Sequence, residues 1–251
     1  PLPFQYESTG KVSQFTNWME PHARSRDIFS FHRPETLREM AQQEKPLRAY
    51  LREMPPVLEQ GLWPKQFIAI TNLEKSLRLA KPKALIQMAT GSGKTFAAAN
   101  ISYRLIKHAH ARRVCFLVDR TNLGIQTLKE FQQFQPPDER FTFDKLYNTA
   151  FPQRNHFDPV NRVIITTIQR LYSVLTGQPE LAEEDEERSA YEGPGAFKKP
   201  PVPITYNPAL PPEFFDVLIV DECHRSIYSV WGDVLKYLDA FLVGLTATPS
   251  K

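Results

Sequence analysis

The chain has 251 residues, of which 41% are hydrophobic and 24% are charged, and its formal net charge is +3. This length can bury one large α/β domain with added segments, or two small domains. No stretch approaches the roughly 20 continuous apolar residues of a membrane helix, and residues 1–5 lack the basic and apolar parts of a signal peptide. We therefore expect neither a membrane-spanning helix nor a signal peptide in these residues. With no methionine at its start, the sequence is expected to be a piece of a longer chain.

The two cysteines, Cys115 and Cys223, fall in separate apolar runs that are typical of buried strands. This placement favours reduced thiols, packed as small hydrophobic side chains, in a cytoplasmic protein. Charge is distributed unevenly, because residues 179–212 hold seven acidic and three basic residues and leave about +7 on the rest of the chain. A basic body of this kind is compatible with a polyanionic partner.

Residues 1–57 mix aromatic, basic and proline residues without a sustained period. A helical pattern runs from Pro34 to Leu51, and Pro34 followed by Glu35 is typical of a helix start. We expect an N-terminal extension that packs on the following domain rather than an independent binding module.

Residues 58–251 alternate strand and helix patterns, which predicts an α/β fold with a central, mostly parallel sheet flanked by helices. Strands are expected at 84–88, 114–119, 143–147, 163–167, 216–221 and 241–246, and helices at 66–79, 94–109, 122–134, 168–175 and 228–239. Residues 177–213 are rich in proline and acidic residues, and we expect them to form an exposed, partly disordered insertion.

The run MATGSGKT at residues 88–95 has the pattern of a nucleotide-phosphate cradle. An apolar strand enters it and a helix-forming stretch leaves it, which is the context that a P-loop requires. The glycines let backbone N–H groups converge on an anion, and the helix start adds a positive dipole end. Met88 stands where the strict pattern has glycine, so a glycine-rich turn with a chance Lys-Thr is the alternative. The residues expected to bind the phosphates are Thr90, Gly91, Ser92, Gly93, Lys94 and Thr95.

An apolar run at 217–220 delivers Asp221 and Glu222 at its end. Beside a phosphate site, Asp221 would hold Mg²⁺ together with the Thr95 hydroxyl, and Glu222 would activate the attacking water from a strand next to the P-loop strand. A solvated acidic strand end is the alternative. The run LTATP at 245–249 adds Thr246 and Thr248, which could hydrogen-bond toward the two acids and sense the nucleotide.

Together these runs, MATGSGKT, DECH and LTATP, resemble motifs I, II and III of superfamily-two helicases and translocases. The resemblance covers about residues 60–251 and implies a first RecA-like domain that binds ATP and Mg²⁺ and moves along nucleic acid. Gln66 is similar to the glutamine that grips adenine in these proteins, although Lys65 replaces an aromatic residue often found beside it. A capping role is the alternative for Gln66.

Two further segments resemble the DNA-phosphate contacts of the same superfamily. The first, FLVDRTNL, supplies Arg120, Thr121 and Asn122 at a helix start. The second, TTIQR, supplies Thr167, Gln169 and Arg170. For both segments a helix cap beside a solvated arginine is the alternative.

The N-terminal runs FQYESTG and FHRPETL, with DECHRS and MATGSGKT, resemble the R subunits of type I restriction enzymes. This resemblance implies a subunit that hydrolyses ATP to pull double-stranded DNA past its methyltransferase and specificity subunits before cleavage. The Glu-x-Lys of the family's nuclease centre and the second RecA-like domain are not found in these residues, so we expect nucleotide binding with weak hydrolysis. Another superfamily-two repair or RNA helicase, or a P-loop module that only senses nucleotide, remain as alternatives.

Overall fold

The computed structural model describes residues 2–178, 202–223 and 231–248. Most of the insertion expected at 177–213, the start of the helix expected at 228–239, and His224 of the DECH run therefore lie outside the described residues. Across the described part of the chain, none of the helices combines the length and the apolar character needed to cross a bilayer.

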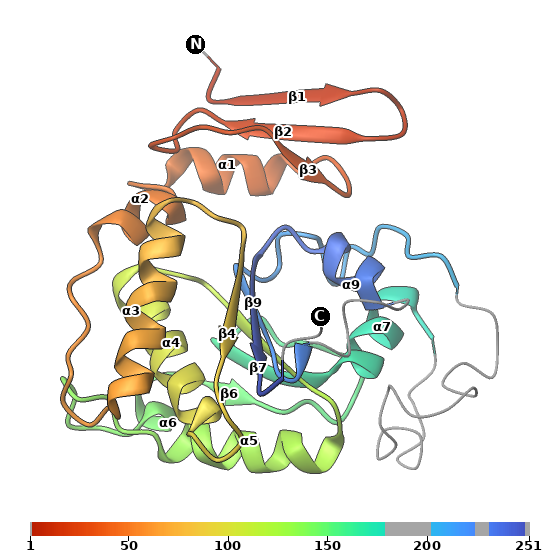
Figure 1. Cartoon of the computed structure of the whole chain (residues 1–251). Coiled ribbons are helices and arrows are strands. Elements are labelled where there is room, and N and C mark those ends of the chain that lie inside the picture. The colour runs from red at the N-terminus through yellow and green to blue at the C-terminus, as the bar shows by residue number, and fades with distance from the viewer. Residues whose placement is uncertain (1, 179–201, 224–230, 249–251) are drawn as a thin grey trace.

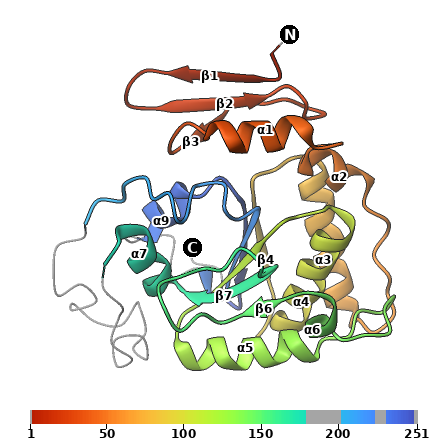
Figure 2. The same cartoon turned by 180° about the vertical axis from the view of Figure 1, so that it is seen from behind.

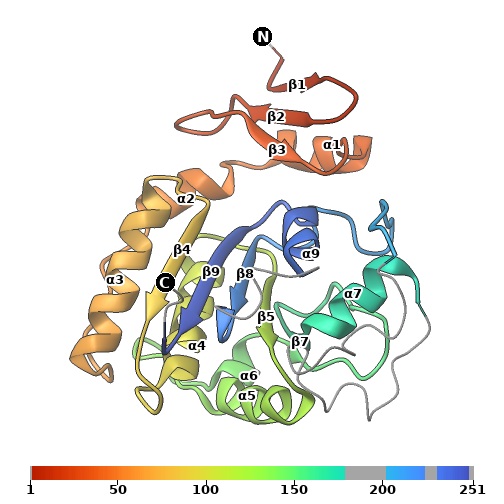
Figure 3. The same ribbon diagram turned by 45° about the vertical axis from the view of Figure 1, so that its right-hand side comes forward.

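The core is a sheet in which each strand runs parallel to its neighbours, in the order β4-β9-β8-β5-β7-β6. Figure 3 shows this order from β4 to β7. The strands are β4 (Lys83–Gln87), β5 (Val114–Val118), β6 (Thr149–Ala150), β7 (Val163–Thr167), β8 (Val217–Val220) and β9 (Phe241–Thr246). Because parallel strands all end at one edge, the residues that follow them gather on that edge of the sheet.

Helices cover both faces of this sheet, as the fully apolar strands predicted (Figures 1 and 2). Alternate residues of β5 face opposite ways: Phe116 packs in one apolar cluster, whereas Cys115 and Leu117 pack in the other. The first cluster includes buried residues of α3 (Pro64–Arg78), α4 (Lys94–His108) and α5 (Thr121–Gln133). The second includes those of α7 (Ile168–Thr176) and α9 (Trp231–Tyr237). The predicted α/β class is thus confirmed.

The strand predicted at 143–147 is wrong, because Phe143–Leu146 forms the short helix α6 and β6 follows it at Thr149–Ala150. Phe143 is fully buried, and its ring lies 5.8 Å from Phe131 and 5.5 Å from Tyr147. One helical turn brings Phe143 and Tyr147 to the same side of the chain. Aromatic residues four positions apart fit a helical turn as well as an alternating strand.

The N-terminal segment contains a small antiparallel sheet that the sequence did not predict, made of β1 (Phe4–Ser8), β2 (Ser13–Asn17) and β3 (Arg26–Ile28). The helix expected over 34–51 is divided into α1 (Pro34–Gln42) and α2 (Leu47–Glu53). Pro46 occupies the N-cap position of α2. Proline in the interior of a helix lacks the N–H donor and clashes with the preceding turn, so one helix does not run through position 46. Where this segment ends and the next domain begins stays a prediction.

Ion pairs join the N-terminal segment to the amino end of β9. The Arg26 guanidinium donates from Nε to both carboxylate oxygens of Asp239, at 3.0 and 3.1 Å, and from Nη1 to Glu20. Arg48 also contacts Glu20 and lies 4.7 Å from the centre of the Phe241 ring. Burial alone would raise the pKa of Asp239, but the nearby Arg26 charge and its hydrogen bonds hold that pKa below its usual value.

Replacing Asp239 with asparagine should lower the free energy of unfolding by about 2 kcal/mol at pH 7, because Arg26 would lose a partly buried carboxylate whose two oxygens both accept from its Nε. The stabilisation from a carboxylate with a lowered folded-state pKa is complete above the pKa of the unfolded chain, about 3.9. It is lost as the pH falls through the folded-state value. Urea denaturation at pH 7 and pH 3 measures both effects.

Asp233→Asn is the control for this prediction, since the Asp233 and Lys236 side chains are 71% and 79% exposed and their ion pair should contribute about 0.5 kcal/mol or less. A difference between wild type and Asp239→Asn that does not narrow at pH 3 would contradict the account.

Candidate functional site

The loop between β4 and α4 has the backbone that the MATGSGKT run predicted. Gly91 and Gly93 have φ angles of +75° and +76°, in the left-handed region that glycine adopts without strain. The helix α4 begins at Lys94, directly after Gly93. Its first turn presents N–H groups without intrahelical acceptors and a positive dipole end to the loop, which suits a bound anion.

Met88, which replaces the usual first glycine, directly follows β4 and precedes the curled part of the loop. Its N–H donates to the Thr246 carbonyl at 2.9 Å, and its side chain is buried in the apolar core. Its φ angle is not among the positive ones, so this position does not require glycine. The substitution is therefore compatible with an intact phosphate loop.

The loop lysine and the second strand-end acid are in direct contact. Lys94 Nζ lies 3.0 Å from Glu222 Oε1, although the two residues are 128 positions apart. The expectation that Glu222 sits on the strand next to the P-loop strand is wrong, because β9 lies between β4 and β8. The chain reverses immediately after β8, where Glu222 has a φ of +46°, an unusual conformation for a residue other than glycine.

Asp221 lies at the same edge, and its N–H donates to the Leu117 carbonyl of β5 at 2.9 Å. Burial raises the pKa of Asp221, the negative charges of Glu222 and Asp119 raise it further, and Lys94 offsets part of the effect. A cation placed here would favour the ionised carboxylate. The partly buried Asp221 carboxylate therefore fits a metal ion brought by a polyphosphate.

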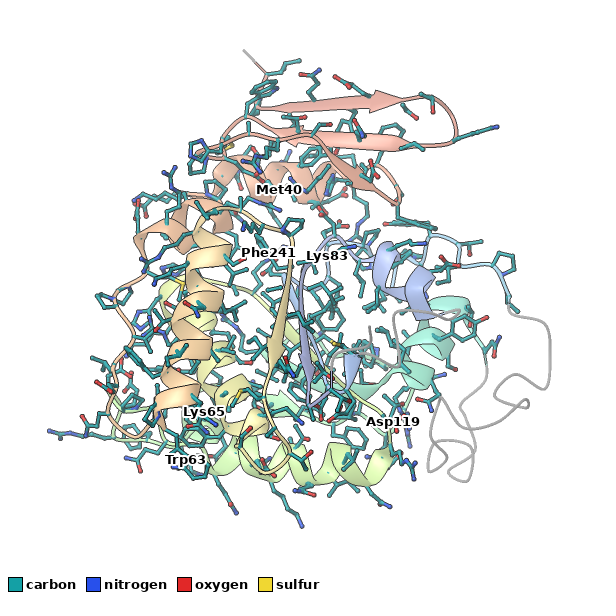
Figure 4. All side chains as sticks on the ribbon, viewed as in Figure 1. Met40, Trp63, Lys65, Lys83, Asp119 and Phe241 are labelled. Carbon is teal, nitrogen blue, oxygen red and sulfur yellow. The ribbon has the colours of Figure 1, made fainter. Side chains whose placement is uncertain are left out.

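Asp119 is a member of this site that the sequence analysis did not single out. It directly follows β5, is 8% exposed, and pairs with Arg120. In Figure 4 it lies at the carboxyl edge of the sheet, at the opposite end from Lys83 and Phe241. The signal was its position directly after an apolar strand, but the neighbourhood of β5 and β8 becomes evident only in the fold.

Gln66, at the start of α3, supports the phosphate loop through hydrogen bonds to the loop backbone. It is 4% exposed, and its amide Nε2 donates to the carbonyls of Ser92 and Gly93 at 3.1 and 3.3 Å. Its Oε1 accepts from the Trp63 N–H at 3.0 Å, so the side chain also caps the helix. Trp63 and Lys65 lie at this end of α3 (Figure 4). Contact between Gln66 and adenine stays a prediction.

Thr246 and Thr248 form a compact turn where β9 ends. The Thr246 hydroxyl donates to the Thr248 carbonyl at 2.9 Å and accepts from the Thr248 N–H at 3.2 Å. Since the Thr246 carbonyl also binds Met88, the end of β9 is tied to the start of the phosphate loop. A role for these hydroxyls in sensing the nucleotide stays a prediction.

The two predicted DNA-contact segments differ in exposure. At the start of α5, Arg120 and Thr121 are partly exposed and Asn122 is exposed. At the start of α7, Gln169 is partly exposed, but Thr167 and Arg170 are buried, and the Thr167 hydroxyl caps the helix by accepting from the Arg170 N–H. Because β5 pairs with β7, both segments share the carboxyl edge, and their contact with DNA stays a prediction.

A parallel sheet with a phosphate loop after an outer strand, and two acids across from the loop lysine, define a RecA-like P-loop domain. Residues 60–251, most of the chain, match the ResIII family, described as the type III restriction enzyme, res subunit. The chain therefore belongs to the ResIII family.

Its curated relatives include endonuclease subunits of type I restriction enzymes. The chain is 31% identical to the EcoAI subunit of Escherichia coli over 81% of its length, and 26% identical to the EcoKI subunit of strain K12 over 99%. It spans 22% and 21% of those proteins, respectively. The solved structure of the Sulfolobus solfataricus SWI2/SNF2 ATPase core in complex with dsDNA is similar to this chain, with a TM-score of 0.50 and 13% sequence identity. The match covers 78% of this chain and 34% of the Sulfolobus chain, and it supports the fold alone.

Replacing Gln66 with glutamate should lower the free energy of unfolding by about 1–3 kcal/mol at pH 8, because a carboxylate would face the Ser92 and Gly93 carbonyls where an amide now donates. The glutamate could still accept the hydrogen bond from the Trp63 N–H that caps α3. Urea denaturation measures the change. Gln87→Glu, an exposed substitution at the end of β4, introduces the same charge and serves as the control; equal effects of the two variants would show that the loop does not depend on Gln66.

Proposed function

We propose that this chain is the ATP-binding first motor domain of an ATP-dependent double-stranded DNA translocase in a type I restriction endonuclease. The contact between Lys94 and Glu222 carries the proposal, because it brings a phosphate-binding cation and a candidate general base to one point. The similarity to type I endonuclease subunits supports the same reading. The whole enzyme would act with methyltransferase and specificity subunits in the cytoplasm, where the two buried cysteines would remain free thiols.

In this proposal the residues of the loop divide the work on ATP. Backbone N–H groups of residues 90–93 and the Lys94 ammonium would bind the phosphates, and the Thr95 hydroxyl and Asp221 would hold Mg²⁺. Mg²⁺ suits this donor set, since it is commonly held by one or two protein oxygens together with substrate phosphates. When bound, the ion would neutralise charge on the phosphates.

Glu222 would orient and deprotonate the attacking water once a phosphate has replaced it as the partner of Lys94. Gln66 would support the loop, and Arg120, Thr121 and Asn122 would contact the DNA backbone. Hydrolysis by the isolated chain would be weak, because groups from a second RecA-like domain would complete the site. A related repair or RNA helicase would show a different nucleic-acid preference in the same assays.

Lys94→Ala and Glu222→Gln in the full-length protein should separate binding from turnover. Lys94→Ala should weaken ATP binding at least tenfold, because it removes the phosphate charge, whereas Glu222→Gln should retain binding and lose turnover by about 100-fold or more. Calorimetric titration and steady-state ATPase assays measure the two quantities. Lys83→Ala, at the amino end of β4 and away from the loop that follows this strand, is the control. An ATP affinity of Lys94→Ala equal to that of the wild type would contradict the proposal.

Arg120→Ala should weaken binding to duplex DNA about equally for all sequences and flatten the plot of log affinity against log salt by about one unit of slope, as expected for one lost phosphate contact. Fluorescence anisotropy at several salt concentrations measures the slope. Arg24→Ala removes the same charge from an exposed position in the N-terminal segment and should leave the slope unchanged. An identical slope in wild type and Arg120→Ala would exclude the contact.

A further inference from the structure

Gly244 lies on β9, between the strand that leads into the phosphate loop and the strand that leads to the two acids. It is paired with Leu85 of β4 on one side and with Val220 of β8 on the other. The first strand leads into the phosphate loop, and the second ends directly before Asp221 and Glu222. A change at Gly244 can therefore reach both the phosphate loop and the two acids.

Cys223 folds back over the sheet onto this glycine. A Cβ atom added at Gly244 would lie 2.6 Å from Cys223 Sγ and 3.2 Å from Cys223 Cβ, the first distance being closer than real Cβ atoms approach. Cys223 is 3% exposed. Its thiol thus occupies the space of a side chain at position 244, and this fit is possible because position 244 has no side chain.

This packing requires the chain to reverse between Val220 and Cys223, and the reversal includes the left-handed backbone of Glu222. A residue other than glycine pays free energy for that conformation and keeps it only when the surroundings hold it. Cys223 directly follows Glu222, and its contact with Gly244 can hold the Glu222 backbone in this conformation.

We infer that Cys223 is a positioning residue, whose packing on the bare backbone of Gly244 fixes the turn at Glu222 and so aims the Glu222 carboxylate at Lys94. The inference rests on the proposed function for its kinetic consequence, but its structural content is independent of hydrolysis. Burial, with the charges of Glu222 and Asp221, raises the pKa of Cys223 to about 11. The side chain therefore acts as a neutral, packed thiol at pH 7.

The surroundings indicate what a methyl group at position 244 would do. Cys223 and Gly244 line a mostly apolar cavity of about 280 Å³, together with Leu85, Leu242 and Leu235. The displaced thiol has room to move into this cavity, so the domain should still fold. The movement would turn the backbone at Cys223, and the adjoining Glu222 carboxylate would leave its position.

The test compares ATP hydrolysis and binding of the analogue ATPγS in the full-length protein for three variants. Gly244→Ala should lower kcat by roughly 100-fold, as expected for a catalytic group misplaced by about 1 Å, and should change the Kd of ATPγS less than threefold. Adding Cys223→Ala to Gly244→Ala should recover most of the lost kcat, because it removes the closest clash. Adding Cys115→Ala, which deletes the other buried thiol, should recover none of it.

A wild-type kcat in Gly244→Ala, or equal recovery with Cys115→Ala, would overturn the inference. A crystal structure of Gly244→Ala gives a readout that does not depend on activity: the 3.0 Å contact between Lys94 Nζ and Glu222 Oε1 should be lost, and its retention would also overturn the inference. If wild-type protein bound no ATPγS, the proposed function would fail, whereas this structural comparison would still decide the role of Cys223.

Discussion

The contact between the Lys94 ammonium and the Glu222 carboxylate is the interaction on which the site depends. The two opposite charges pair at the carboxyl edge of the sheet. Burial at this edge raises the pKa of the neighbouring Asp221. In the proposed function, a triphosphate would compete with Glu222 for Lys94. Binding would therefore release the carboxylate at the moment when a terminal phosphate and its attacking water need it. In this account the ion pair is the resting form of a hydrolytic site.

Strand β9 maintains that geometry, because it separates the phosphate-loop strand from the strand that carries the acids. At its carboxyl end, Thr246 binds the Met88 N–H, and in its middle Gly244 receives the Cys223 side chain. At its amino end, Asp239 is held by Arg26, and Phe241 lies against Arg48. The N-terminal segment and the candidate active site thus contact opposite ends of one strand.

Much of the α/β core could be predicted, because the apolar runs of β7 and β8 and the strand–loop–helix at 84–108 have strong local signals. The failures were of two kinds. Short elements with ambiguous periods were misassigned or missed: the helix at Phe143 was predicted as a strand, and the β1–β3 sheet was not predicted. Neighbours within the site were also misplaced, because strand order is a long-range property and β9 was not expected between β4 and β8. Asp119 follows an apolar strand, but its place beside Asp221, like the support of the loop by Gln66, depends on contacts that only the fold shows. Candidate site residues could be named from the sequence, but their contacts could be seen only in the fold.

The most direct test of the central claim is a crystal structure of the domain with ATPγS and Mn²⁺, using the anomalous signal of manganese to locate the ion. The account predicts a manganese peak between the Thr95 hydroxyl and Asp221, with Lys94 transferred from Glu222 to the phosphates. Nucleotide and manganese bound elsewhere, with the Lys94–Glu222 pair intact, would contradict it.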